Sequence, residues 1–507
     1  MALNNISFVK GKGGLGRPLA GKDYISSLLF YTATLPSGFS TTDRVKQIFS
    51  VQDAEDLGIK ANYSDETKAT GVYTISAVGL TGDKITLNFT KPTGTVVLLG
   101  SYIKTASETT VTAVGTALAS AINALTYIHG HTAVASTGAI TITVASGLGV
   151  YPNTATPLTA VISGTIAGSV TTAFSGGIAS LQAVWYYHIS EFFRMQPKGF
   201  LWLAFYPVPS TYTFSEIQTI QTIAGGDVRQ LGVFVDSTPF VTAHLSAIQT
   251  VCNTLDDLKM PLSVLYAGNI VSFTNISTLP DLAVLTSNKV SVIIGQDASN
   301  LGANLYASTG KSVTTLGATL GTLALANVQE DIAWVGKFNL SNGNELESIA
   351  FANGQKFTDS AITPTLLDAI DLKRYIFLRK FPNKAGSFFN DSHTAIAQNS
   401  DYAFIENNRV IDKAIRGVYA SLIDSLNSPL LLNADGKLAN STVVSLEGLA
   451  KVNTDQMVRD GEVSAVGVVI NPNQNVASTS LITVTINIVP ISVARNIVVN
   501  IGFKTSL

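Results

Sequence analysis

The chain has 507 residues, of which 46% are hydrophobic and only 13% are charged, and its formal net charge is −2. A charged fraction about half the usual one, with a net charge near zero, excludes a general basic footprint for nucleic acid. The single cysteine, Cys252, excludes an intramolecular disulfide framework and a cysteine-rich zinc site. No apolar window approaches the ~20 residues that span a bilayer, and the N-terminus lacks the apolar core of a signal peptide. We therefore expect a multidomain protein, folded in a cytoplasm, with no direct nucleic-acid binding and no membrane insertion.

Residues 1–30 are predicted to form an N-terminal arm and linker. Ile6, Phe8 and Val9 make a short apolar run that is typical of a strand. The stretch that follows has little to bury and much backbone freedom. Its linker glycines are Gly11, Gly13, Gly14 and Gly16.

The stretch GKGGLGRPLAGKD, residues 11–23, matches parts of two phosphate-binding patterns. A P-loop needs a Ser or Thr hydroxyl after the lysine, but Asp23 stands there and would repel phosphate, and Pro18 removes a backbone N–H. The dinucleotide pattern should follow a strand and open a helix, and here a proline follows instead. A second near-match, TGKS at 309–312, has Leu305 in place of the first glycine. We expect a hinge and no nucleotide site.

Residues 31–70 and 178–380 are predicted to form an α/β body. Four continuous apolar runs read as buried strands, at 199–207, 231–236, 261–268 and 289–297. Helical patterns such as 239–258 lie between them. Buried strands that alternate with helices indicate a mainly parallel sheet.

Residues 71–177 are predicted to form an inserted, mostly β domain. Strand patterns occur at 84–90, 95–103 and 139–146, and a helical pattern at 111–125. Because domain insertion is tolerated at exposed loops, we expect this domain on the outer surface. His129 and His131 form a pair without nearby Asp, Glu or Cys to complete a metal site, so we expect surface histidines.

Residues 381–507 are predicted to form a C-terminal domain of two helices followed by strands. The helical patterns cover 407–427 and about 441–459, and strand patterns cover 462–472, 480–490 and 496–504. In the middle strand, apolar and polar residues alternate, as in a half-buried strand. Its apolar residues are Ile482, Val484, Ile486 and Ile488.

Other signals of chemistry are sparse. The chain contains no G-x-S-x-G elbow, and the adjacent Asp256 and Asp257 cannot both face one substrate. The segment KRYIFLRKF, residues 373–381, mixes basic and aromatic residues, and a buried strand with basic flanks explains it better than nucleic-acid binding. We predict no catalytic residue, no metal site and no cofactor.

The C-terminal pattern resembles that of contractile tail sheath proteins. It consists of a helix opening NNRVIDKAIR, a second polar helix, a V-x-V-V-I-N-P strand and strands that end the segment. The opening MALNNISFVKGKGGLG also resembles that of sheath-like phage and prophage proteins. The resemblance covers most of the chain outside residues 71–177, which correspond to the most variable part of such families.

The resemblance implies a structural subunit that is not an enzyme. Such subunits polymerise helically around an inner tail tube and contract from a metastable extended state to drive the tube through a target envelope. The implied partners are further copies of the chain, the tube protein, and baseplate and tail terminator proteins. The implied location is a virion tail assembled in a bacterial cytoplasm. Two alternatives stay open: a non-contractile structural virion protein, and an α/β enzyme with an unrecognised site.

The resemblance also implies two sets of interface residues. Strand exchange between subunits would use the terminal apolar strands. Its residues are Ile6, Phe8, Val9, Ile482, Val484, Ile486 and Ile488. The second C-terminal helix would face the tube with a charged stripe at i, i+4 spacing, made of Glu447, Lys451, Asp455 and Arg459, while Leu446, Leu449, Ala450 and Met457 pack inward. The alternative for the first set is an ordinary terminal strand within one chain. The alternative for the second is a solvated helix face with intrahelical ion pairs.

Overall fold

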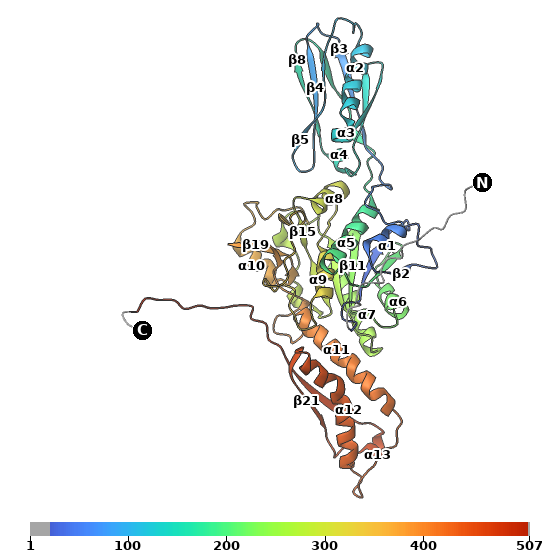
Figure 1. Ribbon diagram of the computed structural model, residues 1–507, viewed down its shortest axis with the longest axis vertical. Helices are drawn as coiled ribbons and strands as arrows, with labels where there is room; N and C mark the ends of the chain where they lie inside the picture. Colours follow the sequence, from blue (N-terminus) through green and yellow to red (C-terminus); the bar gives the residue numbers. More distant parts are fainter. Residues whose placement is uncertain (1–20, 505–507) are drawn as a thin grey trace, which may run out of the picture.

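The computed structural model describes residues 21–504 as three modules in a row (Figure 1). The α/β body lies in the middle, the inserted domain at one end and the C-terminal domain at the other. The predicted mixed α/β, multidomain class is confirmed. Seven predicted arm and linker residues lie outside the described residues: Ile6, Phe8, Val9, Gly11, Gly13, Gly14 and Gly16.

A seven-stranded sheet organises the body, in the order β17-β14-β12-β11-β1-β10-β2. All neighbouring pairs are parallel except β10 with β2, which agrees with the predicted mainly parallel sheet. All six residues of the interior strand β1 are buried, as expected for a sheet covered on both faces. The strands are β1 (Ser26–Tyr31), β2 (Val45–Ile48), β10 (Leu201–Tyr206), β11 (Gln230–Pro239), β12 (Ser263–Asn269), β14 (Val290–Ile293) and β17 (Tyr375–Ile376).

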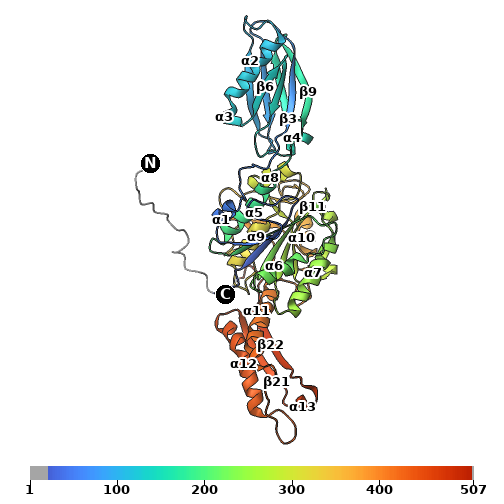
Figure 2. The same ribbon diagram turned by 90° about the vertical axis from the view of Figure 1, so that its right-hand side faces the viewer.

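Helices cover both faces of this sheet (Figure 2). The helices α5 and α9 pack together on one face, and α6 and α7 contact each other on the other. A Cβ atom at Gly317 of α9 would lie 2.0 Å from the His188 carbonyl oxygen of α5, so glycine permits this close crossing. The helices are α1 (Val51–Asp56), α5 (Leu181–Met195), α6 (Glu216–Ile223), α7 (Thr242–Asp257), α8 (Leu301–Thr309), α9 (Leu316–Leu325) and α10 (Pro364–Leu372). None of the helices in residues 21–504 is long and apolar enough to cross a membrane.

The inserted domain runs from β3 to β9 and has its own core around Phe89 and Leu118. One sheet has the order β6-β7-β3-β9 and the other β5-β4-β8. The first sheet is built from β3 (Thr70–Ala77), β6 (Thr132–Ser136), β7 (Ala139–Thr143) and β9 (Ala167–Ser175). The second is built from β4 (Lys84–Thr90), β5 (Val96–Ile103) and β8 (Leu158–Ser163). The helices are α2 (Val111–Ala124), α3 (Thr126–His129) and α4 (Tyr151–Thr154).

The expectation of two surface histidines in this domain is wrong. Both His129 and His131 are buried, and the His131 ring lies 4.4 Å from that of Phe89. The His129 Nε2 atom lies 2.9 Å from the Leu99 carbonyl oxygen. Burial, reinforced by the charges of His129 and two lysines, lowers the pKa of His131 to about 3, so the ring is neutral. The pair belongs to the core.

The C-terminal domain packs two helices on a two-stranded sheet. Its elements are α11 (Ile405–Leu422), α12 (Asn440–Arg459), β21 (Val463–Ile470), α13 (Val476–Thr479) and β22 (Val484–Pro490). The structure places its start at α11, because β18 (Leu378–Phe381) pairs with β19 (Lys384–Phe389), and β20 (Ala395–Ile396) pairs with β13 (Thr286–Ser287) of the body. The predicted boundary at 381 instead cuts this region, and the strand expected at 496–504 is absent from the described residues.

Ion pairs fix the first turns of α11 to the body. The Lys289 ammonium contacts the Asp412 carboxylate in a buried pair. The Lys413 ammonium lies 2.7 Å from Asp23 and 2.5 Å from Glu462. Burial alone would lower the pKa of Lys413, but these two carboxylates raise it above its ordinary value. Asp23, which disqualified the P-loop, therefore ties the start of the body to the C-terminal domain.

Candidate assembly interface

The lysines of both phosphate-like motifs lie among the described residues, and each is paired with a carboxylate; residues 11–20 of the first motif lie outside the described part. The Lys22 ammonium donates to both oxygens of Asp227, at 2.8 and 2.6 Å. The second motif follows the last residues of α8 (Leu301–Thr309), whereas phosphate sites use the N-terminus of a helix. Its Lys311 donates to Asp236 at 3.2 Å. Both lysines thus serve as partners of carboxylates.

Aromatic side chains fill the place where a parallel sheet of this topology would bind a ligand. That place lies at the carboxyl ends of β1 and β11, where the strand order reverses. The Tyr31 and Tyr212 rings meet edge to face at 4.9 Å, and Tyr212 stacks on the buried Phe214 at 5.4 Å. The His244 Nδ1 atom lies 2.7 Å from the Tyr266 hydroxyl. Side-chain packing closes this crevice.

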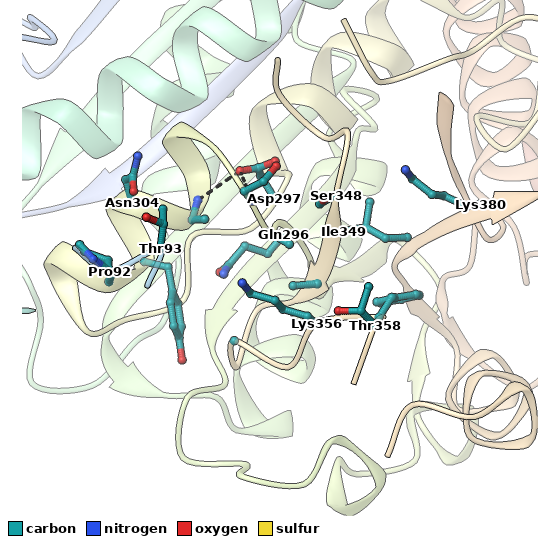
Figure 3. A pocket seen from close by; sticks show the side chains of 18 of the residues that line it. Pro92, Thr93, Gln296, Asp297, Asn304, Ser348, Ile349, Lys356, Thr358 and Lys380 are labelled. Atoms are coloured by element: carbon teal, nitrogen blue, oxygen red, sulfur yellow. Dashed lines mark hydrogen bonds between the residues drawn. The ribbon is translucent and has the colours of Figure 1, made fainter. Parts of the chain in front are cut away.

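A cleft of about 910 Å³ separates the turn between β4 and β5 from the body (Figure 3). It is lined, among others, by Pro92, Thr93, Gln296, Asn304, Ser348, Lys356, Thr358 and Lys380, from elements that include β15 (Gly295–Asp297) and β16 (Ile349–Phe351). Its carboxylate, Asp297, accepts backbone N–H groups from Asn300 at 2.6 Å and Leu346 at 2.9 Å. The described residues that line it include no histidine or cysteine.

Within residues 21–504, no group of three His, Cys, Asp or Glu side chains is placed to hold a metal ion. Among the described residues that line the cleft, Asp297 is the one carboxylate, and it accepts backbone N–H groups. The C-terminal domain presents a different kind of surface, formed by a two-stranded sheet.

The sheet of the C-terminal domain is incomplete. Among the described residues, β21 and β22 pair only with each other, from Val463 opposite Pro490 to Ile470 opposite Val484. One face packs on α12, while the other is open, with Val469 56% exposed. Each strand therefore keeps one free edge, and a two-stranded ribbon is marginal by itself. Such an edge is a template for a further strand.

Of the predicted C-terminal strand-exchange residues, Val484, Ile486 and Ile488 lie in β22, and Ile482 lies just before it. Ile482, Val484, Ile486 and Ile488 are half-buried and alternate with exposed residues, which matches the predicted half-buried pattern. Ile482 and Val484 pack against a small core that includes Leu446, and Ile488 packs against another that includes Met457. The partner strand is β21 of the same chain, and exchange between chains stays a prediction for these residues.

The chain continues beyond β22 as a C-terminal arm, defined here as residues 491–504. The arm forms no helix or strand and extends away from the molecule (Figure 1). From Ile497 to Phe503 its large apolar side chains lie in solvent: Val498 is 84% exposed and Ile501 is 94% exposed. An exposed apolar run of this kind marks an interaction segment.

The predicted charged stripe of α12 is less exposed than its spacing suggests. Glu447, Lys451 and Asp455 are half-buried, and Glu447 Oε1 accepts the Ile470 N–H of β21 at 2.8 Å. Arg459 donates to the side chain of Gln456 at 2.8 Å, not to a carboxylate. In the described part of the chain, none of the four joins an ion pair, so the alternative of a face with intrahelical ion pairs is not observed.

The outermost line of α12 is instead apolar. We call Val444, Gly448 and Val452 the α12 crest: they recur every four residues, and both valines are more than half exposed. The predicted inward residues Leu446, Ala450 and Met457 are buried, whereas Leu449 is 37% exposed. The i, i+4, i+8 spacing of the crest is present in the sequence. The charged residues beside it have the same spacing and give the stronger signal of an exposed face.

These features define an elongated, multidomain α/β protein whose C-terminal sheet has two strands and unpaired outer edges within residues 21–504. The chain belongs to the DUF2586 family: residues 3–393 match the DUF2586 N-terminal domain, and residues 401–507 match the DUF2586 C-terminal domain. The two matches meet just before α11. No curated protein matches the chain.

Among solved structures, the chain is similar to three chains of the anti-feeding prophage. One is from its helical sheath in the contracted state, with 14% identity, a TM-score of 0.45, and coverage of 63% of this chain and 81% of that one. Another is from its sixfold-symmetrised baseplate, with 12% identity, a TM-score of 0.43, and coverage of 63% and 80%. The third is from its baseplate in the contracted state, with 13% identity, a TM-score of 0.41, and coverage of 64% and 85%.

Proposed function

We propose that this protein is the structural subunit of a contractile tail sheath. It polymerises helically around an inner tail tube, and the polymer contracts from a metastable extended state to drive the tube through a target envelope. The observation that carries the proposal is the pairing, in one chain, of an incomplete sheet with an exposed apolar arm. The first accepts a strand and the second supplies one.

Strand donation from one copy to the next makes a head-to-tail contact. A heterologous contact of this kind propagates into an open helix unless its rotation closes a ring. Beyond the contact of Arg495 with the body, residues 496–504 of the C-terminal arm span at most about 30–32 Å when extended. The predicted strand at Ile6, Phe8 and Val9 would join the same sheet from another copy.

The remaining surfaces take roles consistent with this arrangement. The inserted domain, at the far end from the C-terminal domain, decorates the outside of the polymer. The α12 helix faces the inner tube, with the α12 crest in the centre and the predicted charged residues along its flank. Baseplate and tail terminator proteins close the two ends, and the particle assembles in a bacterial cytoplasm. Contraction needs two packings of the same subunit and neither catalysis nor a cofactor.

Negative-stain microscopy and sedimentation of the purified protein test the proposal. We expect the full chain to form hollow tubes and a variant ending at Pro490 to remain a folded, soluble subunit. A matched variant with residues 71–175 replaced by a Gly/Ser linker should still form tubes. Tubes from the truncated variant, or a monodisperse full chain at every salt concentration, would contradict the proposal.

A further inference from the structure

Among the described arm residues, the side-chain hydrogen bonds and ion pairs to the body come from one residue, Arg495. Its Nε donates to both carboxylate oxygens of Asp391 at 3.0 Å. Its terminal nitrogen donates to Glu406 at 2.5 Å, Asp331 at 3.2 Å and the Ser392 hydroxyl at 3.4 Å. We call Asp331, Asp391 and Glu406 the acidic socket; the three carboxylate side chains are 6%, 13% and 3% exposed.

An aromatic ring completes the acidic socket. The Arg495 guanidinium carbon lies 3.5 Å from the centre of the Phe404 ring. On the same ring, the buried Arg374 guanidinium lies at 4.8 Å and donates to the Ala403 carbonyl oxygen. A planar guanidinium both stacks on a ring and donates in a fork, which an ammonium does not. The site is therefore selective for arginine over lysine.

The acidic socket is assembled from three distant parts of the chain. Asp331 follows α9, Asp391 follows β19, and Glu406 lies in the first turn of α11, where the helix dipole favours a carboxylate. Burial raises the pKa of Asp331 to about 8, and repulsion by Glu406 and Asp391 adds to the effect. Buried carboxylates this close together are costly without a cation between them. The guanidinium supplies that cation.

The C-terminal arm forms a turn at Arg495 and is exposed beyond it. The Arg495 N–H donates to the Val493 carbonyl oxygen at 3.2 Å, which closes a three-residue turn. Among the described arm residues, Arg495 alone donates side-chain hydrogen bonds to the body. Beyond it, residues 496–504 run into solvent with their apolar side chains exposed.

We propose that the acidic socket is a guanidinium-binding site whose ligand is Arg495, and that this anchor sets the direction in which residues 496–504 are offered to a second copy of the chain. The second half of this statement rests on the proposed function. An anchored arm loses less conformational freedom when it binds than a free one does, so the anchor favours association. The expected effect of losing it is at least a tenfold rise in the concentration needed for assembly.

Spin-label distances in the unassembled subunit test the anchor itself. One label is placed through Val498→Cys on the arm and the other through Leu372→Cys on α10; both sites are exposed, and the native Cys252 is buried. We expect one narrow distance distribution in this background and in the matched control Lys504→Met, a broad one in Arg495→Met, and an intermediate one in Arg495→Lys. Equal widths in all four would overturn the anchor.

Assembly of the same variants without labels tests the direction of the arm. We expect Arg495→Met to require at least tenfold more protein for assembly and Lys504→Met to behave as the native chain. A broad arm distribution together with native assembly would overturn the second half of the proposal. If Arg495→Met alone fails to fold, Arg495→Met with Asp391→Asn removes one charge of each sign. If the native chain does not assemble, the proposed function fails, and the spin-label distances still decide the anchor.

Discussion

The two modules appended to the body differ in how much of their structure one chain completes. The inserted domain encloses a single core with 19 buried hydrophobic residues in its cluster, between two sheets and α2. The C-terminal domain has one cluster of four buried hydrophobic residues and shares a second, of five, with Val328 of the body. Among the described residues it also has free strand edges and an open sheet face. Similar strand and helix types thus give a domain with an enclosed core in one case and a domain with unpaired strand edges in the other.

The largest expected effect concerns the module with the enclosed core. Phe89 is fully buried in the core of the inserted domain. We expect Phe89→Ala to lower the free energy of unfolding of that domain by about 3–5 kcal/mol. Hydrogen exchange should report faster opening of β3–β9 with unchanged protection in the body sheet. Loss of protection in both would show that the two cores are coupled and would break the comparison.

The two regions should also respond to pH in opposite directions. The pKa of His131, lowered to about 3 by burial, lies below its unfolded value, so its contribution to the inserted domain is present above about pH 6.5 and is lost as the pH falls. The pKa of Asp331, raised to about 8, lies above its unfolded value. Its contribution at the acidic socket is present below about pH 4 and is lost as the pH rises, by at most about 1.4 kcal/mol per pH unit.

Thermal unfolding at pH 5, 7 and 8.5, monitored by hydrogen exchange, measures these opposite pH dependences. Asp331 faces Glu406, Asp391 and Arg495, and Asp331→Asn removes the group that must ionise. We expect the variant to gain stability relative to the native chain between pH 5 and 8 at the junction with α11, and to leave the inserted domain unchanged. A constant difference across this range would contradict the assignment.

Substitutions at two adjacent residues of β22 should distinguish the stability of the subunit from its assembly. Ile488 is half-buried against its own chain, whereas Val489 points to the open face and is 55% exposed. We expect Ile488→Ala to cost the subunit about 1–2 kcal/mol, less than a full core truncation. Val489→Ala should change the free energy of unfolding by less than about 0.5 kcal/mol and still weaken assembly. Native assembly of Val489→Ala would mean that the open face stays open in the polymer.

The smallest effect on stability is expected at the α12 crest. Val452→Lys places a charge on an exposed position and should alter the free energy of unfolding by less than about 0.5 kcal/mol. If the crest contacts the inner tube, co-sedimentation with tube protein should fall while the sheath still polymerises alone. The matched variant Lys451→Glu, on the flank, tests the charged stripe in the same assay. Unchanged binding by both variants would remove α12 from the tube contact.

Elements with a strong local pattern could be predicted from the sequence. The strand 84–90 has the predicted bounds, and the alternation in 480–490 matches the half-buried face of β22. The pattern could not show that the Glu447 carboxylate accepts a hydrogen bond from the Ile470 N–H, because that bond joins a helix to a strand. A helix face read alone therefore appears more charged and more exposed than it is.

Contacts between distant segments were not predictable in the same way. The crevice of the body sheet is closed by rings from positions 31, 212 and 266, which no spacing rule connects. The acidic socket brings positions 331, 391, 406 and 495 together across two modules. Two carboxylates and an arginine outside regular elements, and one glutamate in a first helical turn, carry no local signal of a site. Only the tertiary fold brings them together.

The backbone bridge between Thr67 and Ile178 has a consequence for how this protein can change. The Thr67 N–H donates to the Ile178 carbonyl oxygen at 3.1 Å, and the Ile178 N–H donates back at 2.8 Å. The chain thus leaves the body and returns to it at one point, with one further backbone bond from Val150 to Ser308 at 2.7 Å. A domain with adjacent ends can replace residues 71–175 without altering the register of the body sheet. The inserted domain can therefore change in sequence or size while the body sheet keeps its register.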